Sequence, residues 1–171
     1  MKRKLENMFY NLNRIDQIGL ILNTVQNCDG VIQDSLYHPE GDVLNHSLQV
    51  FKHALRETNN LDLIMAALLH DVGKQIESHG HEKYSIQLLD GLISEKTKWL
   101  ILNHMRIWAY IMGEMKKLSK VFELQSHPLF LELIMLARWD KRGRNPNAKL
   151  KFDRLKIIDQ LKIKQEILKN E

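Results

Sequence analysis

His70 and Asp71 stand side by side at the end of a largely apolar run, residues 61–69. A charged aspartate in apolar surroundings is costly unless it is paired with a cation or bound to a metal. A neutral imidazole and a carboxylate together form a common mixed ligand set for divalent metals. The pair therefore predicts a metal site near the centre of the fold.

Two further residues could complete that site, although each has an ordinary structural interpretation. His46 lies among apolar residues that should face the core, but a lone core histidine is more often a hydrogen-bonded structural residue, and His53 could equally fill that role. Asp140 closes an apolar run and could simply pair with Lys141 or Arg142. The ordered set of a histidine, a His-Asp pair and a distant aspartate is what favours metal binding.

The elements that must position these residues are predicted to be helices. Apolar residues recur at spacings of three and four almost throughout, and alternating β-branched runs are absent. The chain holds just three prolines and eight glycines, so few positions interrupt a helix. An all-α fold is therefore expected.

Capping residues and helix breakers predict where the helices begin and end. Asp42 should cap a second helix after a first one at about residues 4–27. Asn60 should cap the third, from Leu61 to about Val72, which Gly73 ends and which is apolar enough to be central and buried. The remaining helices are predicted at about residues 82–92, 94–105, 128–140 (starting at Pro128) and 150–168.

Bulk properties restrict the class of protein. The 171 residues are 44% hydrophobic and 27% charged, which is typical of a soluble globular chain, and without repeats or linkers they predict one domain over residues 1–171. No membrane-spanning stretch or signal peptide is recognisable, and the single cysteine excludes an intramolecular disulfide and a multi-cysteine zinc site. A cytoplasmic protein is expected. The net charge of +4 is too modest to indicate nucleic-acid binding by itself.

The order His46, His70-Asp71, Asp140 resembles the HD-domain superfamily of metal-dependent phosphohydrolases, and residues 66–74 resemble its central helix and turn. Residues 38–47, 80–82, 103–106 and 140–144 are similar to the HD domain of bacterial CCA-adding tRNA nucleotidyltransferases and related RNA-end-processing proteins. The resemblance covers residues 38–144. The chain has no Gly-Ser motif with paired acidic residues, so it is not expected to add nucleotides.

The resemblance implies a single-domain, HD-type helical bundle with flanking terminal helices, and it assigns roles by position. His46, His70, Asp71 and Asp140 would bind a divalent metal, with manganese, iron, cobalt, nickel, zinc and magnesium all compatible. Lys74 would contact the substrate phosphate. Five further residues are weaker candidates: His81 and His104 for a second metal or the leaving phosphate, and Arg106, Arg142 and Arg144 for phosphate binding. Solvation or surface ion pairs explain these five nearly as well, and no role is predicted for His38, His79 or His127.

These roles predict a phosphatase or phosphodiesterase that acts on a nucleotide or an RNA-terminal phosphate such as a 2',3'-cyclic phosphate. Asp71 would orient or deprotonate the attacking water, and Lys74 would stabilise the transition state. The alternatives are a hydrolase of free nucleoside mono- or triphosphates, a non-catalytic module that binds nucleotide or RNA, and a di-iron oxygenase. No membrane partner is expected, and the apolar stripe of the last helix could pack within the chain or across a homodimer.

Overall fold

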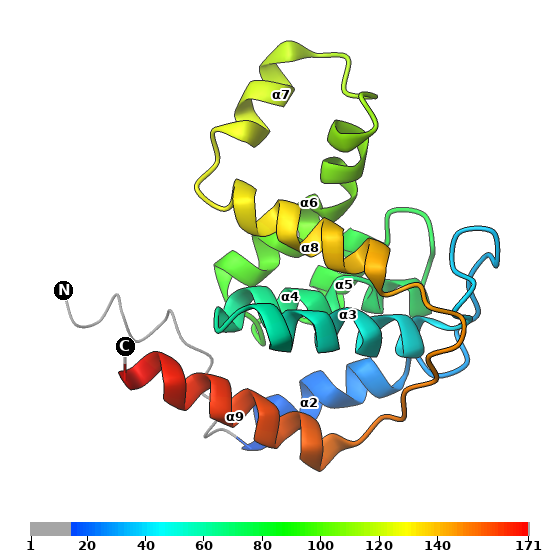
Figure 1. Ribbon diagram of the computed structural model, residues 1–171, viewed down its shortest axis with the longest axis vertical. Helices are drawn as coiled ribbons and strands as arrows, with labels where there is room; N and C mark the ends of the chain where they lie inside the picture. Colours follow the sequence, from blue (N-terminus) through cyan, green and yellow to red (C-terminus); the bar gives the residue numbers. More distant parts are fainter. Residues whose placement is uncertain (1–14, 171) are drawn as a thin grey trace.

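The computed structural model describes residues 15–170, and Figure 1 shows their arrangement as a bundle of helices. The described residues contain no strand, only an isolated antiparallel bridge between Ile32 and Asp42, so the all-α prediction is confirmed. In chain order the elements are α2 (Ile15–Gln26), α3 (Val43–Glu57), α4 (Leu61–Leu69), the 3₁₀ helix η1 (Val72–Gln75), α5 (His81–Leu88), α6 (Glu95–Ile111), α7 (Leu118–Gln125), α8 (Phe130–Arg142) and α9 (Arg154–Asn170).

Both predicted caps form. The Asp42 side chain accepts a hydrogen bond from the Asn45 amide, and the Asn60 side chain accepts one from the Leu63 amide. The third helix is shorter than predicted: α4 ends at Leu69 because the chain tightens into η1 after it. Part of the predicted first helix, residues 4–14, lies outside the described residues.

Other helix boundaries differ from the prediction for local reasons. Helix α6 continues to Ile111 instead of ending at 105, because no glycine or proline interrupts it before Gly113, which adopts a φ of 70°. The short helix α7 was not predicted, and Pro128 lies in a turn before α8. Helix α9 starts at Arg154 rather than 150, since the Leu150 amide donates to the Asn45 side chain.

Helix α4 forms the centre of the bundle, as its apolar sequence predicts. Every residue of it except Asp62 is buried, and it packs against α3, α6 and α8. In Figure 1, α8 lies above α3 and α4, and α2 and α9 lie below them. The end of α4 therefore delivers His70 and Asp71 to the middle of the molecule. Within the described residues, no helix has the length and apolarity needed to cross a membrane.

Candidate metal centre

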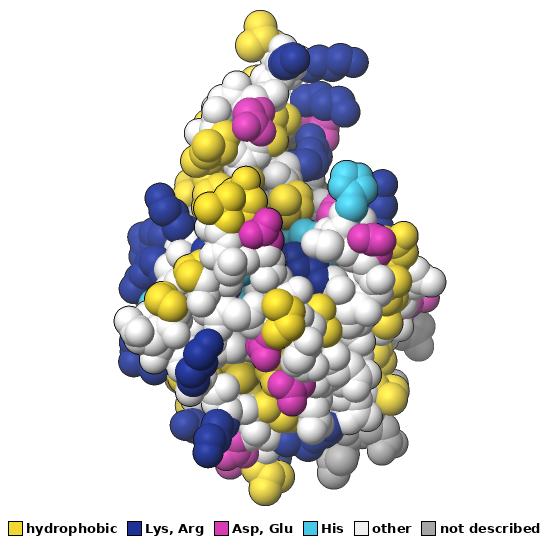
Figure 2. Space-filling view, turned by 90° about the vertical axis from the view of Figure 1, so that its right-hand side faces the viewer, with side chains coloured by type: hydrophobic (Ala, Val, Ile, Leu, Met, Phe, Trp, Pro, Cys, Tyr) yellow, Lys and Arg dark blue, Asp and Glu magenta, His cyan; other side chains and the backbone are white. Residues whose placement is uncertain are grey.

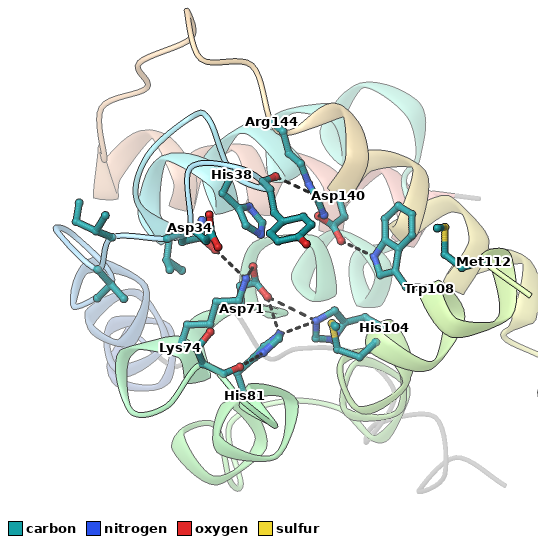
Figure 3. A pocket seen from close by; sticks show the side chains of 17 residues that line it. Asp34, His38, Asp71, Lys74, His81, His104, Trp108, Met112, Asp140 and Arg144 are labelled. Atoms are coloured by element: carbon teal, nitrogen blue, oxygen red, sulfur yellow. Dashed lines mark hydrogen bonds and ion pairs between the residues drawn. The ribbon is translucent and has the colours of Figure 1, made fainter. Parts of the chain in front are cut away.

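A cavity of about 510 Å³ opens next to the end of α4. Its polar floor includes Asp71, Lys74, His81, His104 and Asp140, and its walls are largely apolar. Figure 2 shows this face, on which histidine and basic side chains lie in a recess bordered by hydrophobic ones. Figure 3 shows the floor residues pointing toward one another from several helices.

The chain brings together all six histidines and aspartates that were candidates for metal binding. His46 comes from the first turn of α3, the His70-Asp71 pair from the junction of α4 and η1, His81 from the start of α5, His104 from α6, and Asp140 from α8. All six residues are buried. They form two sets of three whose potential ligand atoms lie within 4.8 Å of one another. We call His46, His70 and Asp140 the inner group, and Asp71, His81 and His104 the outer group.

Gly73 explains how α5 comes close enough to contribute His81. A Cβ atom at Gly73 would lie 2.0 Å from the His81 carbonyl oxygen, so only glycine permits this approach. The Gly73 amide donates to the Ser85 hydroxyl over 2.8 Å, and that hydroxyl donates to the His70 carbonyl oxygen over 3.1 Å. Gly73 was expected only to end a helix, whereas it also fixes the spacing between the two groups.

Asp71 lies between the two groups. Its Oδ2 atom is 3.5 Å from Nε2 of His70 and 3.7 Å from Nε2 of His46. Its Oδ1 atom is 2.9 Å from Nε2 of His81 and 3.5 Å from Nε2 of His104. In the inner group, Nε2 of His46 also lies 3.2 Å from Oδ1 of Asp140. One carboxylate thus presents a different oxygen to each group.

The four histidine rings are all held in place through their Nδ1 atoms. Each Nδ1 atom faces an oxygen acceptor: the carbonyls of Ala67, Ser78 and Ile101 for His70, His81 and His104, and the carbonyl of Gly143 together with a carboxylate for His46. Because Nδ1 must carry a proton to donate there, each neutral ring has its lone pair on Nε2.

The four Nε2 atoms lie close to carboxylates, and the two in the outer group also lie close to each other. Nε2 of His81 and Nε2 of His104 are 2.9 Å apart, which requires a proton or another cation between them. Within residues 15–170, the buried Nε2 atoms of His46 and His70 have no hydrogen-bond partner. A divalent cation would satisfy lone pairs and carboxylates together, so the residues fit a metal.

Electrostatics favour the ligand forms of several groups. Burial lowers the pKa of His70 to about 3, so this ring is neutral near pH 7. Burial alone would raise the pKa of both Asp71 and Asp140, but neighbouring imidazoles, and Lys74 beside Asp71, hold both well below the ordinary range. Both carboxylates are therefore ionised.

Two histidines instead bind protons more tightly than usual. Burial opposes the charged form of His46, yet the carboxylates of Asp140, 3.2 Å from Nε2, and Glu40, 2.7 Å from Nδ1, favour the charged ring and raise its pKa to about 9. Burial opposes the charged form of His81 as well, but its hydrogen bond to Asp71 raises its pKa. A metal that used these Nε2 atoms would have to displace protons.

Two basic side chains reach the floor of the cavity. Nζ of Lys74 lies 2.7 Å from Oδ2 of Asp71 and 2.7 Å from Oε1 of Gln33. Arg144 donates to Oδ1 of Asp140 over 2.9 Å, one helical turn after that residue. Trp108 donates from its indole nitrogen to the other Asp140 oxygen over 2.8 Å.

The other two arginine candidates do not line the cavity. Arg106 donates to the Asn103 side chain and pairs with Glu123. Arg142 pairs with Glu57, a carboxylate that also binds other side chains of α8. A direct contact from either arginine to a phosphate in the cavity would require these pairs to break.

Sequence reasoning missed the buried carboxylate behind His46. The Glu40 side chain is completely buried, and its Oε1 atom lies 2.7 Å from Nδ1 of His46 and 2.9 Å from Nδ1 of His38. The available signal was the segment His38-Pro39-Glu40, where an acidic residue lies close in sequence to histidines. From the sequence alone, this segment is interpreted only as a loop.

Comparison with protein families matches residues 43–145 of this chain to a family model described as the HD domain. The chain belongs to the HD-domain family. HD domains are generally metal-dependent hydrolases that act on phosphate esters. The HD match includes every residue of the inner and outer groups, and it begins after Glu40.

The chain is also similar to proteins named multifunctional CCA protein. The multifunctional CCA protein of Janthinobacterium sp. (strain Marseille) is 29% identical over 175 residues, which cover 89% of this chain and 41% of that protein. The multifunctional CCA protein of Paraburkholderia phytofirmans is 35% identical over 99 residues, which cover 54% of this chain and 24% of that protein. The chain thus spans less than half the length of these relatives. The predicted similarity to HD domains and to CCA proteins is confirmed.

Proposed function

We propose that the chain is a metal-dependent phosphatase or phosphodiesterase that acts on a nucleotide or an RNA-terminal phosphate, such as a 2',3'-cyclic phosphate. The observation that carries this proposal is the convergence of four histidine Nε2 atoms on two buried carboxylates at the floor of an open cavity. Membership of the HD-domain family supports the same reaction class.

The arrangement around Asp71 favours two metal positions over one. Its two oxygens face different histidine pairs, and a carboxylate between two positions suits a pair of cations that share it. A bound divalent metal would lower the pKa of a water and neutralise charge that develops on the phosphoryl group.

Side chains at the cavity floor would position the attacking water and stabilise the transition state. Asp71 is ionised and accessible from the cavity, so it can orient the attacking water and accept its proton. Lys74 lies at the same floor and can donate to a phosphoryl oxygen in the transition state. Trp108 and Arg144 hold the two oxygens of Asp140 and so fix its orientation.

The cavity and the relatives support a nucleoside phosphate or an RNA end as the substrate. The walls include the apolar or aromatic side chains of Tyr37, Met105, Trp108 and Met112, which can contact a base or sugar while the polar floor takes the phosphate. The similarity to multifunctional CCA proteins favours an RNA end.

A hydrolase of free nucleotides is the second candidate. A cavity of about 510 Å³ lies within the size range of small-molecule sites and suits one nucleotide. A panel of nucleoside mono- and triphosphates, 3'-phosphorylated oligonucleotides and 2',3'-cyclic phosphates, assayed with several divalent metals, separates the two candidates.

The same panel tests the proposed reaction when it is applied to Asp71→Ala. We expect the folded variant to lose metal-stimulated hydrolysis, because Asp71 serves both groups. Asp159→Ala is the matched control, since Asp159 is an exposed carboxylate on α9. Robust hydrolysis by folded Asp71→Ala protein would contradict the proposal.

A further inference from the structure

Glu40 is a buried charge outside the two ligand groups. It lies in the loop before α3, does not line the cavity, and is completely buried. Its backbone carbonyl oxygen accepts hydrogen bonds from the Asn45 side chain over 3.0 Å and from Nζ of Lys149 over 2.7 Å. These contacts tie the loop to the segment between α8 and α9, so the position of Glu40 is well defined.

The Glu40 carboxylate pairs with two histidines. Oε1 lies 2.7 Å from Nδ1 of His46 and 2.9 Å from Nδ1 of His38, a residue at the wall of the cavity. The two rings meet edge to face with their centroids 4.9 Å apart. A buried carboxylate is costly unless it is hydrogen-bonded and paired, and the two rings provide that compensation at Oε1. Among residues 15–170, the buried Oε2 atom has no hydrogen-bond partner.

His46 therefore differs from the other three candidate histidine ligands. His70, His81 and His104 each anchor Nδ1 on a neutral backbone carbonyl, whereas His46 anchors Nδ1 on a carboxylate as well as on the Gly143 carbonyl. A carboxylate behind an imidazole fixes its tautomer and makes Nε2 a stronger donor to a metal. The two outer histidines lack a carboxylate in that place, because their Nδ1 atoms face the backbone carbonyls of Ser78 and Ile101.

We propose that Glu40 is a positioning residue for the inner group. It holds the His46 proton on Nδ1, directs Nε2 toward Asp140 and Asp71, and makes the inner group the tighter of two metal positions. His38 helps to keep the carboxylate in place through the same oxygen, Oε1. This inference rests on the metal centre of the proposed function and adds a residue that the HD-domain match does not include.

The test compares metal binding by the full chain and its variants after removal of metal with a chelator. Glu40→Gln keeps the size of the side chain and an oxygen that can accept from His46, but it removes the charge. Glu57→Gln is the matched control, because Glu57 is an ion-paired glutamate outside the cavity. Titration with Zn²⁺ against a chromophoric chelator gives the dissociation constant of each binding step.

We expect the wild-type chain to bind zinc in one tight and one weaker step. In Glu40→Gln the tight step should weaken by about 10–100-fold, as for other outer partners of metal-bound histidines, while the weaker step stays unchanged. Glu57→Gln should match the wild type in both steps. An unchanged tight step in folded Glu40→Gln protein overturns the inference.

A second readout separates positioning from a merely structural role. Nuclear magnetic resonance of ¹⁵N-histidine in the zinc-loaded chain should show a strongly hydrogen-bonded Nδ1 proton on His46, shifted upfield in Glu40→Gln. If Glu40→Gln does not fold, His38→Ala removes one of the two partners of the carboxylate, and a smaller weakening of the same tight step is expected. A His38→Ala variant with wild-type affinity then overturns the inference.

The outcomes distinguish this inference from the proposed function. A wild-type chain that binds no metal refutes the metal centre, and with it both proposals. Wild-type binding with equal affinity in Glu40→Gln refutes only the role of Glu40. A third zinc equivalent that disappears in His38→Ala also refutes that role, because His38, Glu40 and His46 would then be ligands themselves.

Discussion

The inner and outer groups use similar side chains in different settings. The inner histidines, His46 and His70, are buried behind the cavity floor, on or next to the central helices α3 and α4. The outer residues all line the cavity, and two of them, Asp71 and His81, come from the short elements around η1 and α5. The inner histidines are thus part of the core, while the outer group lines the cavity together with Asp140 of the inner group.

The difference suggests a division of labour between the groups. A position whose two histidines lie in the core, one of them supported by Glu40, suits a permanently bound cation. A position whose residues all line the cavity suits a cation that meets the substrate. If the two groups were equivalent, loss of a ligand from either should have the same consequence.

Loss of one histidine from each group should therefore have unequal effects. His70→Ala should lower turnover on the order of 10⁴-fold, because several kcal/mol of transition-state stabilisation depend on the tightly held cation. His81→Ala should lower turnover by about 10²-fold, and millimolar metal should restore part of it. Steady-state assays across a metal titration measure both effects, and equal losses with equal recovery would argue against two distinct positions.

Gly73→Ala should separate the groups without removal of a ligand. The added Cβ would lie 2.0 Å from the His81 carbonyl oxygen and push α5 away from η1. We expect a loss of stability of about 1–3 kcal/mol and a bound-metal content that falls from two equivalents to one. Denaturant unfolding and elemental analysis measure these changes.

Gly19→Ala is the control for that substitution. Gly19 lies in α2 with nothing within 4 Å of an added Cβ, so alanine should stabilise the helix by about 0.5–1 kcal/mol and leave the metal content unchanged. A Gly73→Ala protein that retains both metal equivalents would mean that α5 does not set the outer position.

The smallest expected effect is a pH dependence of the metal-free protein. The pKa of His46 is about 9 in the fold against an ordinary value of 6.5, so its proton stabilises the fold fully below about pH 6.5 and less as the pH rises through 9. The raised pKa of His81 acts in the same direction. The pKa of His70 is lowered from 6.5 to about 3, so its titration changes stability only below about pH 6.5.

Thermal unfolding should therefore show a lower Tm at pH 9 than at pH 7 for the metal-free chain. The zinc-loaded chain should lose less, because the metal has already displaced these protons. A metal-free Tm that rises between pH 7 and pH 9 would contradict the assigned proton on His46.

Much of the site could be read from the sequence because its determinants are local. The caps Asp42 and Asn60 and the apolar run of α4 fix where His46, His70 and Asp71 stand. The arginine candidates differ in their distance along the chain from Asp140. Arg144 follows Asp140 by four residues and shares its side of the chain, whereas Arg142 follows Asp140 by two and faces Glu57.

The remainder depends on tertiary contacts that no local pattern encodes. Glu40 is recognisable as buried only once the loop before α3 meets the segment after α8. Helix α7 has eight residues and a single buried side chain, Leu124, so its periodic signal is weak. The close approach at Gly73 likewise requires α5 to fold back on η1.

The central claim is a pair of metal positions on either side of Asp71. Anomalous diffraction from crystals of the chain grown with Mn²⁺ tests it most directly. We predict two peaks, one among His46, His70 and Asp140 and one among Asp71, His81 and His104. Peaks outside these groups, or none at either of them under saturating metal, would contradict the account.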